Sequence, residues 1–236
     1  MWLIAEFRSS TLFSLRPATA TTSGGKTLVT PTPFALKMAL LDVAIRVHGR
    51  AAGEAWFPQL RDMKVAAQLP SHFAVVNTFV KIMRPYKNGP ADRSGTGIVS
   101  PMGDTIAYRE LVQYGGALWL AFEKQAEVPL LALLVQVNYL GKRGGFMQFA
   151  GWEESGPLPV GFTRLNPEPG ASFRVEGLLQ MLDDCGPKMT FAHADIYSEK
   201  SISLDKPNGR VLRPVVLPYR QGQSNRSFTL YERIDN

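Results

Sequence analysis

The alternation of apolar and polar positions predicts a strand and then a long helix in the first part of the chain. Residues 2–8, WLIAEFR, have the length and composition of a short strand. Thr32 suits an N-cap, Pro33 suits the first helical position, and Gly49 can end the helix. Because apolar side chains occupy two faces of the segment between these residues, we expect a mostly buried helix. The first face holds Phe34, Met38, Leu41 and Ile45, and the second holds Leu36, Leu40, Val43 and Val47.

Alternating and apolar segments farther along the chain predict several strands. FAVVNTFVKIMR (73–84) alternates as a strand does, and TIAYRELVQYGGALWLAFE (105–123) is typical of two strands joined at its Gly-Gly pair. VPLLALLVQV (128–137) fits either a buried helix or a strand, since its length does not decide between them. Two more strands, 211–219 and 227–234, are predicted to be joined by the polar turn RQGQSN.

Two long segments between these elements are predicted to be loops. Residues 9–32 contain eleven Ser or Thr residues, which satisfy backbone groups locally and also suit contact with phosphate. This first loop is therefore either a surface loop or a phosphate-contacting segment. Residues 85–104 contain four glycines and three prolines, so they form a long loop or a loose hairpin. A loop of this length within a compact domain is often functional.

A shorter segment, GKRGG from Gly141 to Gly145, places two adjacent cations among three glycines, directly after the apolar 128–137 segment. It is either a turn between buried elements or a place where the backbone approaches an anion. The spacing matches neither the phosphate-binding loop GxxxxGK[ST] nor the dinucleotide motif GxGxxG, so we expect no nucleotide cofactor.

Charge favours an anionic partner. The 236-residue chain, long enough for one large domain or two small ones, has a net charge of +6 and an isoelectric point near 9.5. The excess is unevenly distributed: residues 1–48, 49–147 and 200–236 carry +3, +4 and +4, whereas residues 148–199 carry −5. Nucleic acid is the commonest partner of such basic segments, although a high isoelectric point can also serve solubility alone.

Candidate catalytic and metal-binding residues are scattered along the chain. His48, His72 and His193 lie far apart and match no metal-binding spacing, so we expect a structural or surface role for each. No GxSxG serine motif occurs. The sequence therefore predicts no catalytic constellation, no metal and no cofactor.

The single cysteine, Cys185, excludes an internal disulfide and a multi-cysteine metal site. Its neighbours Asp183 and Asp184 should raise its pKa, and we expect these aspartates to form a solvated acidic turn rather than a metal pair. No apolar run is long enough to span a bilayer, and Glu6 and Arg8 interrupt the apolar start of the chain. We therefore expect a soluble protein that is not exported and that resides in a reducing cytosol.

The predicted order of elements is strand, loop, helix, strand, insertion, strand, apolar element, glycine-basic turn and strand, which is close to the βαββαβ order of ferredoxin-like domains. Three stretches sharpen this reading: TPTPFALKMALLDVAI (30–45), TIAYRELVQYGG (105–116) and VNYLGKRGGFMQF (137–149). Together they resemble the RAMP proteins of CRISPR systems. In particular, the chain resembles the fifth CRISPR-associated protein family, the Cascade subunit that caps the 5′ handle of CRISPR RNA (crRNA). The resemblance covers residues 1–150, and beyond them only the predicted terminal hairpin matches.

This resemblance implies an α+β fold with a ferredoxin-like (RRM-like) RAMP domain over residues 1–150 and a C-terminal β-rich extension over residues 151–236. It implies that residues 85–104 form a thumb that wedges beside RNA and contacts the neighbouring backbone subunit. The part of the first loop from Arg8 to Lys26 would lie against the handle, and Lys142 and Arg143 of the glycine-basic turn would face RNA phosphates near the 5′ end. The residues expected to contact RNA are Arg8, Arg16, Lys26, Lys37, Lys81, Arg84, Lys87, Arg109, Gly141, Lys142, Arg143 and Gly144.

The resemblance also implies a cytoplasmic, prokaryotic subunit of a type I CRISPR effector complex in antiviral defence. Its partners would be crRNA and the Cascade backbone and large subunits; contact with target DNA near the protospacer-adjacent motif stays open. Some family members cut precursor RNA with a tyrosine, lysine and histidine cluster, but no matching Lys-His pair occurs here. We therefore expect a non-catalytic subunit.

Two alternatives stay open at this point. The chain could be a metal-independent RAMP endoribonuclease that uses a histidine such as His48 with Lys26 or Tyr108. It could also be a ferredoxin-like module unrelated to RNA.

Overall fold

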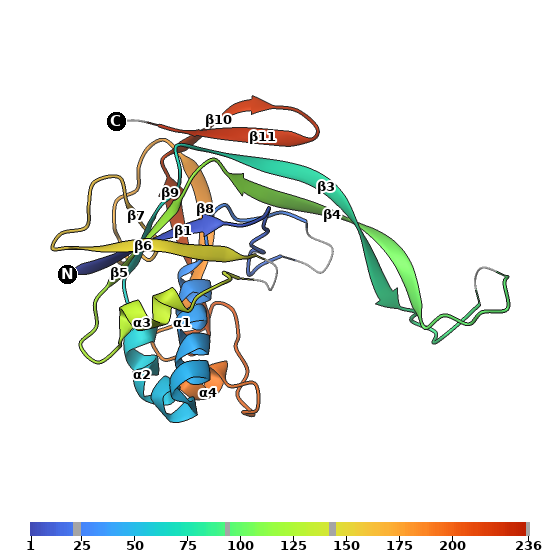
Figure 1. Ribbon diagram of the computed structural model, residues 1–236, viewed down its shortest axis with the longest axis horizontal. Helices are drawn as coiled ribbons and strands as arrows, with labels where there is room; N and C mark the ends of the chain where they lie inside the picture. The colour runs from blue at the N-terminus through green and yellow to red at the C-terminus, as the bar shows by residue number, and fades with distance from the viewer. Residues whose placement is uncertain (21–24, 93–94, 142–144, 235–236) are drawn as a thin grey trace.

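The computed structural model of the chain describes residues 1–20, 25–92, 95–141 and 145–234 (Figure 1). None of the helices in these ranges is long and apolar enough to cross a membrane. The helices are α1 (Pro33–His48), α2 (Arg50–Asp62), α3 (Leu130–Val135) and α4 (Phe191–Ala194). The strands are β1 (Trp2–Ser9), β2 (Val65–Gln68), β3 (His72–Pro85), β4 (Met102–Tyr114), β5 (Leu118–Glu123), β6 (Met147–Ser155), β7 (Thr163–Arg164), β8 (Leu178–Cys185), β9 (Arg210–Leu217), β10 (Tyr219–Ser224) and β11 (Phe228–Arg233).

The centre of the molecule is an antiparallel sheet with the strand order β6-β1-β5-β2-β7. Along the chain, β1 is followed by α1 and α2, then by β2, and β5 is followed by α3 and β6. Helices α1, α2 and α3 lie below the sheet in Figure 1 and cover one of its faces. This is the βαββαβ arrangement, so the prediction of an α+β, ferredoxin-like fold is confirmed.

The second strand of this unit is β2, and the assignment of that place to residues 73–84 was wrong. The 73–84 segment is a strand, but β3 belongs to a different sheet, of order β10-β11-β3-β4. Strands β3 and β4 pair continuously from Phe73↔Tyr114 to Pro85↔Met102. Their hairpin leaves the core and extends far to one side as an arm (Figure 1). The predicted insertion, residues 85–104, covers only the outer end of this arm.

Helix α1 has the predicted boundaries. Its N-cap Thr32 accepts a hydrogen bond from the Ala35 amide at 3.1 Å through Oγ1, and Gly49 closes the far end with φ +86°. Leu36, Leu40, Leu41 and Val43 are buried, whereas Ile45 and Val47 are 36% and 50% exposed. The face with Leu36, Leu40 and Val43 is therefore buried over the first three turns. On the other predicted face Phe34 and Met38 are only half-buried, so the prediction of a mostly buried helix holds for one face and in part for the other.

Helix α2 follows immediately and packs closely on α1. A Cβ atom at Gly53 would lie 2.5 Å from Ile45 Cγ1, so only glycine allows this approach. The 128–137 segment, which the sequence left open between helix and strand, forms the short helix α3 and its C-terminal turn.

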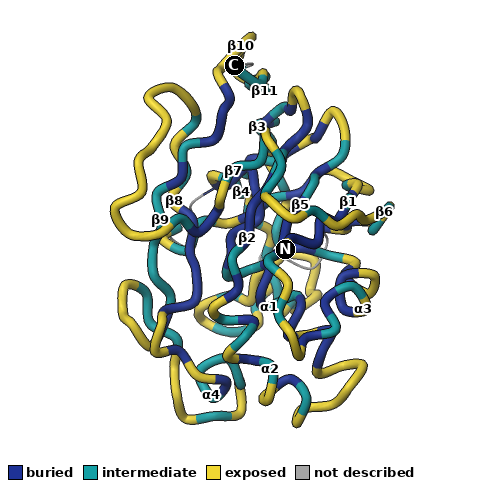
Figure 2. Tube along the Cα trace, turned by 90° about the vertical axis from the view of Figure 1, so that its left-hand side faces the viewer, coloured by how far each residue is buried: buried dark blue, intermediate teal, exposed yellow. Residues whose placement is uncertain are grey.

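The C-terminal part of the chain shares the core of the N-terminal part. Strands β8 and β9 pair with each other, and buried Leu182, Val215 and Leu217 belong to the same hydrophobic cluster as Leu3 of β1. Figure 2 shows buried positions along β2, β8 and β9 in one continuous region. The boundary drawn after residue 150 falls inside β6 rather than at a break in the structure.

The predicted terminal hairpin is corrected in one respect. Strands 211–219 and 227–234 are not partners, because β9 pairs with β8 and ends before Pro218. The polar stretch that was predicted as a turn is instead strand β10, which pairs with β11. All but the first residue of β10 are exposed, so its polar composition suits the outer strand of the sheet.

Candidate nucleic-acid interface

The glycine-basic turn begins and ends beside the place where β1 leaves the sheet. Arg8 of β1 pairs with Gln148 of β6, and the Ser10 amide donates to the Phe146 carbonyl at 3.1 Å. The Leu140 amide donates to the Gly145 carbonyl at 3.1 Å, which closes the turn. The beginning of the first loop and the two flanks of the turn therefore meet at one corner of the sheet.

Gly141 occupies a position that requires glycine. Its φ is +77°, and a Cβ atom would lie 2.9 Å from Leu15 Cδ2 of the first loop. The remaining residues expected in this turn to contact RNA, Lys142, Arg143 and Gly144, lie outside the described residues.

The corner exposes both a cation and an aromatic ring. The Arg8 side chain is 68% exposed and donates through Nε to Glu6 Oε1 at 2.9 Å. Phe146 is 52% exposed and lines a groove of about 530 Å³ together with Ser10, Val135 and Gln148. Exposed rings beside cations suit a single-stranded nucleic acid, because bases stack on the rings while the cations attract phosphate.

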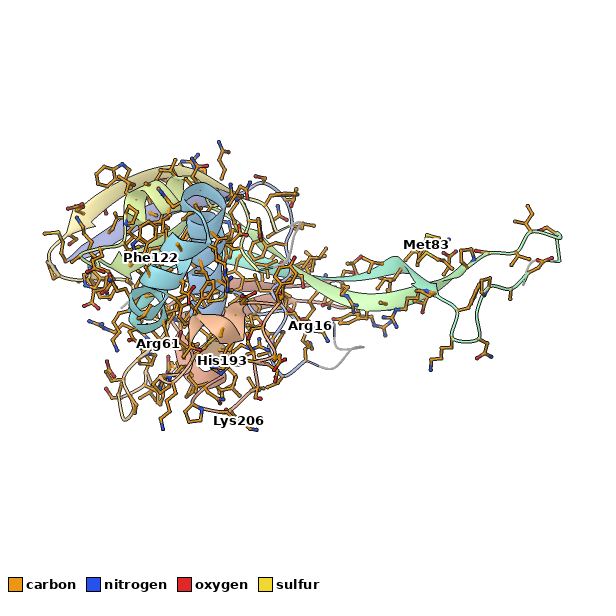
Figure 3. The ribbon with its side chains drawn as sticks, turned by 90° about the horizontal axis from the view of Figure 1, so that it is seen from below. Arg16, Arg61, Met83, Phe122, His193 and Lys206 are labelled. Carbon is orange, nitrogen blue, oxygen red and sulfur yellow. The ribbon has the colours of Figure 1, made fainter. Side chains whose placement is uncertain are left out.

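The described part of the first loop is fixed to the arm and is not a loose surface loop. Phe13, 2% exposed, forms backbone hydrogen bonds in both directions with Val112 of β4, and Leu15 pairs with Leu28. Arg16 is exposed and donates through Nη2 to the Ala20 carbonyl at 3.0 Å. Figure 3 shows Arg16 on the side of the core from which the arm leaves.

A polar cluster centred on Glu110 joins the loop to the base of the arm. The Glu110 carboxylate, in a residue only 6% exposed, accepts hydrogen bonds from Lys26 Nζ at 2.6 Å and from the Thr27 amide at 3.0 Å. The Tyr108 hydroxyl donates to Asn77 Oδ1 at 2.7 Å and lies 3.3 Å from Glu110 Oε1. The cluster borders a cavity of about 250 Å³. Sequence reasoning missed Glu110, although an acidic residue between Tyr108 and Val112 on one face of a strand could have marked it.

The protonation of this cluster follows from its hydrogen bonds. The hydrogen bond from Lys26 to Glu110 raises the lysine pKa, so Lys26 stays cationic. Desolvation raises the pKa of Tyr108, so the phenol keeps its proton at neutral pH. Lys26, with a side chain 78% exposed, can still present N–H groups to an anion, but the Glu110 charge offsets much of its attraction.

The remaining cations that were expected to contact RNA lie on both faces of the arm and at its tip. Lys81 lies on the face with Phe79 and Tyr108 and pairs with Asp104 at 2.5 Å. Arg84 and Arg109 lie on the opposite face, where Arg109 Nη1 donates to the Tyr108 carbonyl at 2.7 Å. Lys87 is exposed in the segment that connects the two strands at the tip.

The same arm exposes an apolar stripe. Phe79, Met83 and Ile106 share a face and are 73%, 61% and 74% exposed, and the Phe79 ring packs edge-on against Tyr108 with centroids 5.8 Å apart. Figure 3 shows Met83 well out along the arm. A run of large exposed apolar side chains on a projecting hairpin is typical of an interaction surface.

Lys37 is not part of any nucleic-acid interface, which corrects the expectation from sequence. It is 1% exposed, and its Nζ donates to Asp184 Oδ1 of β8 and to the Arg61 carbonyl of α2, both at 2.6 Å. The lysine therefore ties α1, α2 and β8 together inside the core. Its position among the apolar residues of α1 reflects this buried partner rather than a solvated face.

The prediction for the two aspartates before Cys185 is also corrected. Asp183 and Asp184 are each 4% exposed within β8, and they pair with Arg210 and Lys37 rather than forming a solvated turn. Burial, with a further contribution from Asp184, raises the pKa of Cys185 to about 12. The expectation of a raised pKa is confirmed, although desolvation is its main cause.

The histidines do not join the Glu110 cluster in the part of the chain that the structure describes. His48 packs against Trp56 at the end of α1, with ring centroids 5.3 Å apart. His72 contacts Ser71, and His193 accepts from Thr190 in a capping box of α4. Of the residues expected to act together in a nuclease, the structure brings together only Lys26 and Tyr108.

Comparison with known proteins identifies a solved structure that has the same fold. No protein-family model and no curated protein matches the chain. A solved structure described as a CRISPR protein from Archaeoglobus fulgidus matches with a TM-score of 0.50 and 12% identity, over 98% of this chain and 91% of that chain.

Two further solved structures match more weakly. A CRISPR RNA-guided surveillance complex matches at a TM-score of 0.46 and 12% identity, over 92% of this chain and 91% of that chain. A type III-B Cmr-beta complex bound to cognate target RNA matches at a TM-score of 0.41 and 13% identity, over 64% and 59%. The chain therefore shares its fold with the CRISPR protein from Archaeoglobus fulgidus.

Proposed function

We propose that this chain is a non-catalytic subunit of a type I CRISPR effector complex that binds and caps the 5′ handle of crRNA. One observation carries the proposal. In a fold shared with a CRISPR protein, β1 ends and β6 begins on the same side of the core as the base of the arm (Figure 1). Arg8 and Ser10 lie at these strand ends, and Gly141 lies against Leu15 of the first loop. RNA lying along this side would meet the first loop, the glycine-basic turn and the arm in succession.

The corner and the arm would each bind a different part of the RNA. Arg8 at the corner would attract phosphates, together with Lys142 and Arg143, which follow Gly141 in the sequence; the exposed Phe146 ring offers a stacking surface to a base. Glycine backbone allows a phosphate to approach main-chain amides closely. Arg84 and Arg109 would continue the basic path along the arm.

The apolar stripe on the other face of the arm would meet a neighbouring subunit of the complex. Phe79, Met83 and Ile106 would lose their solvent exposure there, and burying large apolar side chains favours association by about 25 cal/mol for each Å². The arm would thus connect RNA recognition with assembly.

The proposal is tested with synthetic crRNA that carries a CRISPR repeat sequence. Binding of crRNA that carries its 5′ handle is compared with binding of the same RNA without the handle. We expect the handle to strengthen binding roughly tenfold or more, since each additional contacted phosphate or stacked base contributes about 1 kcal/mol or more. Equal affinity for the two RNAs would contradict the proposal.

A second candidate function is a metal-independent endoribonuclease that processes precursor crRNA. One observation favours it: Lys26 Nζ and the Tyr108 hydroxyl both lie against Glu110 Oε1 beside a cavity. Incubating the protein with labelled repeat RNA in a chelator tests it. Cleavage that Tyr108→Phe abolishes would favour the nuclease, whereas intact RNA at saturating protein would favour the binding subunit.

A further inference from the structure

A large groove lies on the side of the core away from the arm. It has a volume of about 710 Å³ and is bordered by the segment around β7, by Pro167 and residues 171–174, and by the ends of β9 and β11. Figure 1 shows β7 on the opposite side of the molecule from the arm. The volume lies within the range of about 300–1,000 Å³ that is typical of ligand sites.

Among the residues that the structure describes, three arginines line this groove and no aspartate or glutamate does. The Arg164 guanidinium lies over the Trp2 ring, 5.3 Å from its centroid. The carboxylate of Glu168, which lies near Arg164, is bonded by Lys64 instead. The groove therefore receives positive charge from Arg164 and Arg233, and its described lining residues include no carboxylate.

Arg233 is held in place by backbone. Its Nη2 donates to the Gly161 carbonyl at 2.6 Å, and a Cβ atom at residue 161 would lie 2.8 Å from the same nitrogen. Gly161 also has φ +95°, which a side chain disfavours. A guanidinium has more N–H donors than this single bond uses, so Arg233 can bind an anion while it stays oriented.

The groove also has apolar and aromatic walls. Phe162 packs against the face of the sheet formed by Trp2 and Ile4, and Phe173, 52% exposed, lies among the lining residues beside Arg174. Val160 is fully exposed at the rim. Anchored arginines next to exposed aromatic and apolar side chains match both parts of a nucleotide: guanidinium groups bind phosphate, and rings stack on bases.

We propose that this groove is a second nucleic-acid site, which binds nucleotide units of a single strand. Phosphate would contact Arg164, Arg174 and Arg233, and a base would stack on Phe173. An inorganic anion would use only the arginines, and an acidic peptide would gain little from the ring. The site stands independently of the 5′-handle proposal, because it lies on the other side of the core and uses different residues.

The test uses the full chain and a fluorescein-labelled hexauridylate that carries 4-thiouridine. Fluorescence anisotropy gives its affinity, and photocross-linking followed by peptide mapping gives its location. The variants are Arg164→Glu with Arg174→Glu, and separately Phe173→Ala. The control is Lys200→Glu with Lys206→Glu, which reverses the same number of charges at exposed positions outside the groove.

We expect cross-links within residues 158–175 and roughly tenfold weaker binding in the double arginine variant, with the control unchanged. Phe173→Ala should weaken binding about fivefold or more, since stacking contributes about 1–3 kcal/mol for each base. Excess uridine monophosphate and excess hexathymidylate are added separately as competitors, and displacement of the probe by either supports the proposal. Displacement by the monophosphate shows that a free nucleotide is sufficient, whereas displacement by hexathymidylate alone shows that a strand is needed. Because Phe173 is exposed, its variant should fold even if the arginine variant does not.

Three results would overturn the proposal: cross-links confined to other segments, unchanged affinity in both groove variants, or equal displacement of the probe by oligoglutamate. None of them bears on whether the 5′ handle binds at the opposite side. Conversely, loss of handle binding in variants of the glycine-basic turn would leave the cross-links in the groove intact.

Discussion

Replacing Lys37 with methionine should destabilise the protein strongly without weakening RNA binding. Methionine keeps most of the side-chain volume but removes the charge that faces Asp184 and the donor to the Arg61 carbonyl. Both charged partners are almost completely buried, with side-chain exposures of 1% and 6%. The aspartate left behind would keep its hydrogen bonds from the Asn166 side chain and the Cys185 amide but would have lost its cation.

The magnitude follows from this burial. Removing one partner of a buried ion pair leaves an uncompensated charge and typically costs about 3–5 kcal/mol. That loss is a large part of the about 5–15 kcal/mol by which a folded domain is stable. Lys37→Met combined with Asp184→Asn should recover most of the loss, because no buried charge then remains unpaired. Lys81→Met is the matched control: its pair with Asp104 is exposed, so the cost should be about 0–1 kcal/mol.

Urea denaturation followed by circular dichroism measures the free energy of unfolding of the four proteins. Anisotropy with repeat RNA, at a temperature where each variant is folded, measures binding. A loss below about 1 kcal/mol in Lys37→Met, together with weaker RNA binding, would refute the placement of Lys37 in the core.

Three further predictions concern the core and the arm. Leu41→Ala in α1 should cost about 2–5 kcal/mol of unfolding free energy in the same urea assay, because Leu41 is 5% exposed; a cost below about 1 kcal/mol would contradict its burial. The buried thiol of Cys185, with its pKa raised from 9.0 to about 12, keeps its proton in the folded protein while the unfolded chain loses it. Stability should therefore fall as the pH rises from about 9 towards 12, by at most about 1.4 kcal/mol for each pH unit, and Cys185→Ala should fall less steeply; parallel curves would contradict the shift. Replacing residues 88–102 with a short glycine linker should leave the thermal unfolding midpoint nearly unchanged, since the paired and buried residues at the base of the arm remain, and should impair assembly with crRNA and neighbouring subunits; normal assembly in a pull-down would show that the tip is not a contact.

Local patterns predicted the elements whose boundaries are set by nearby residues. Helix α1 was predicted from Thr32, Pro33 and Gly49 because capping and helix ends depend on a few adjacent side chains. Helix α2 was missed because Gly53 and Pro58 lie inside it and lower its helix propensity. Gly53 is explained only by the close approach of α1, which no local pattern contains.

Pairing between distant strands was not readable from the sequence. The four-residue strand β2 gives almost no periodic pattern, whereas β3 alternates clearly over its length, so the longer segment was assigned to the central sheet. The strand partners of β9 and β10 depend on long-range contacts as well, and the polar composition of β10 resembled a turn.

The candidate site was predictable only in part. The glycine-basic turn and the beginning of the first loop were identified from composition, and Gly141 meets Leu15 in the structure. Lys37 was misplaced because a single lysine on an apolar helix looks the same in sequence whether it reaches solvent or a buried carboxylate. Asp184, the residue that decides between these cases, is 147 positions away.

The salt dependence of RNA binding tests the central claim most directly. The logarithm of the affinity for 5′-handle RNA is measured against the logarithm of the salt concentration for the wild type and for Lys142→Glu with Arg143→Glu. If both cations contact phosphate, the slope should become shallower by about 1.4, because each lost contact with a single strand removes about 0.7 from it. The Lys200→Glu, Lys206→Glu control should keep the wild-type slope. An unchanged slope in the turn variant would contradict the account, since the turn would then serve only to connect α3 with β6.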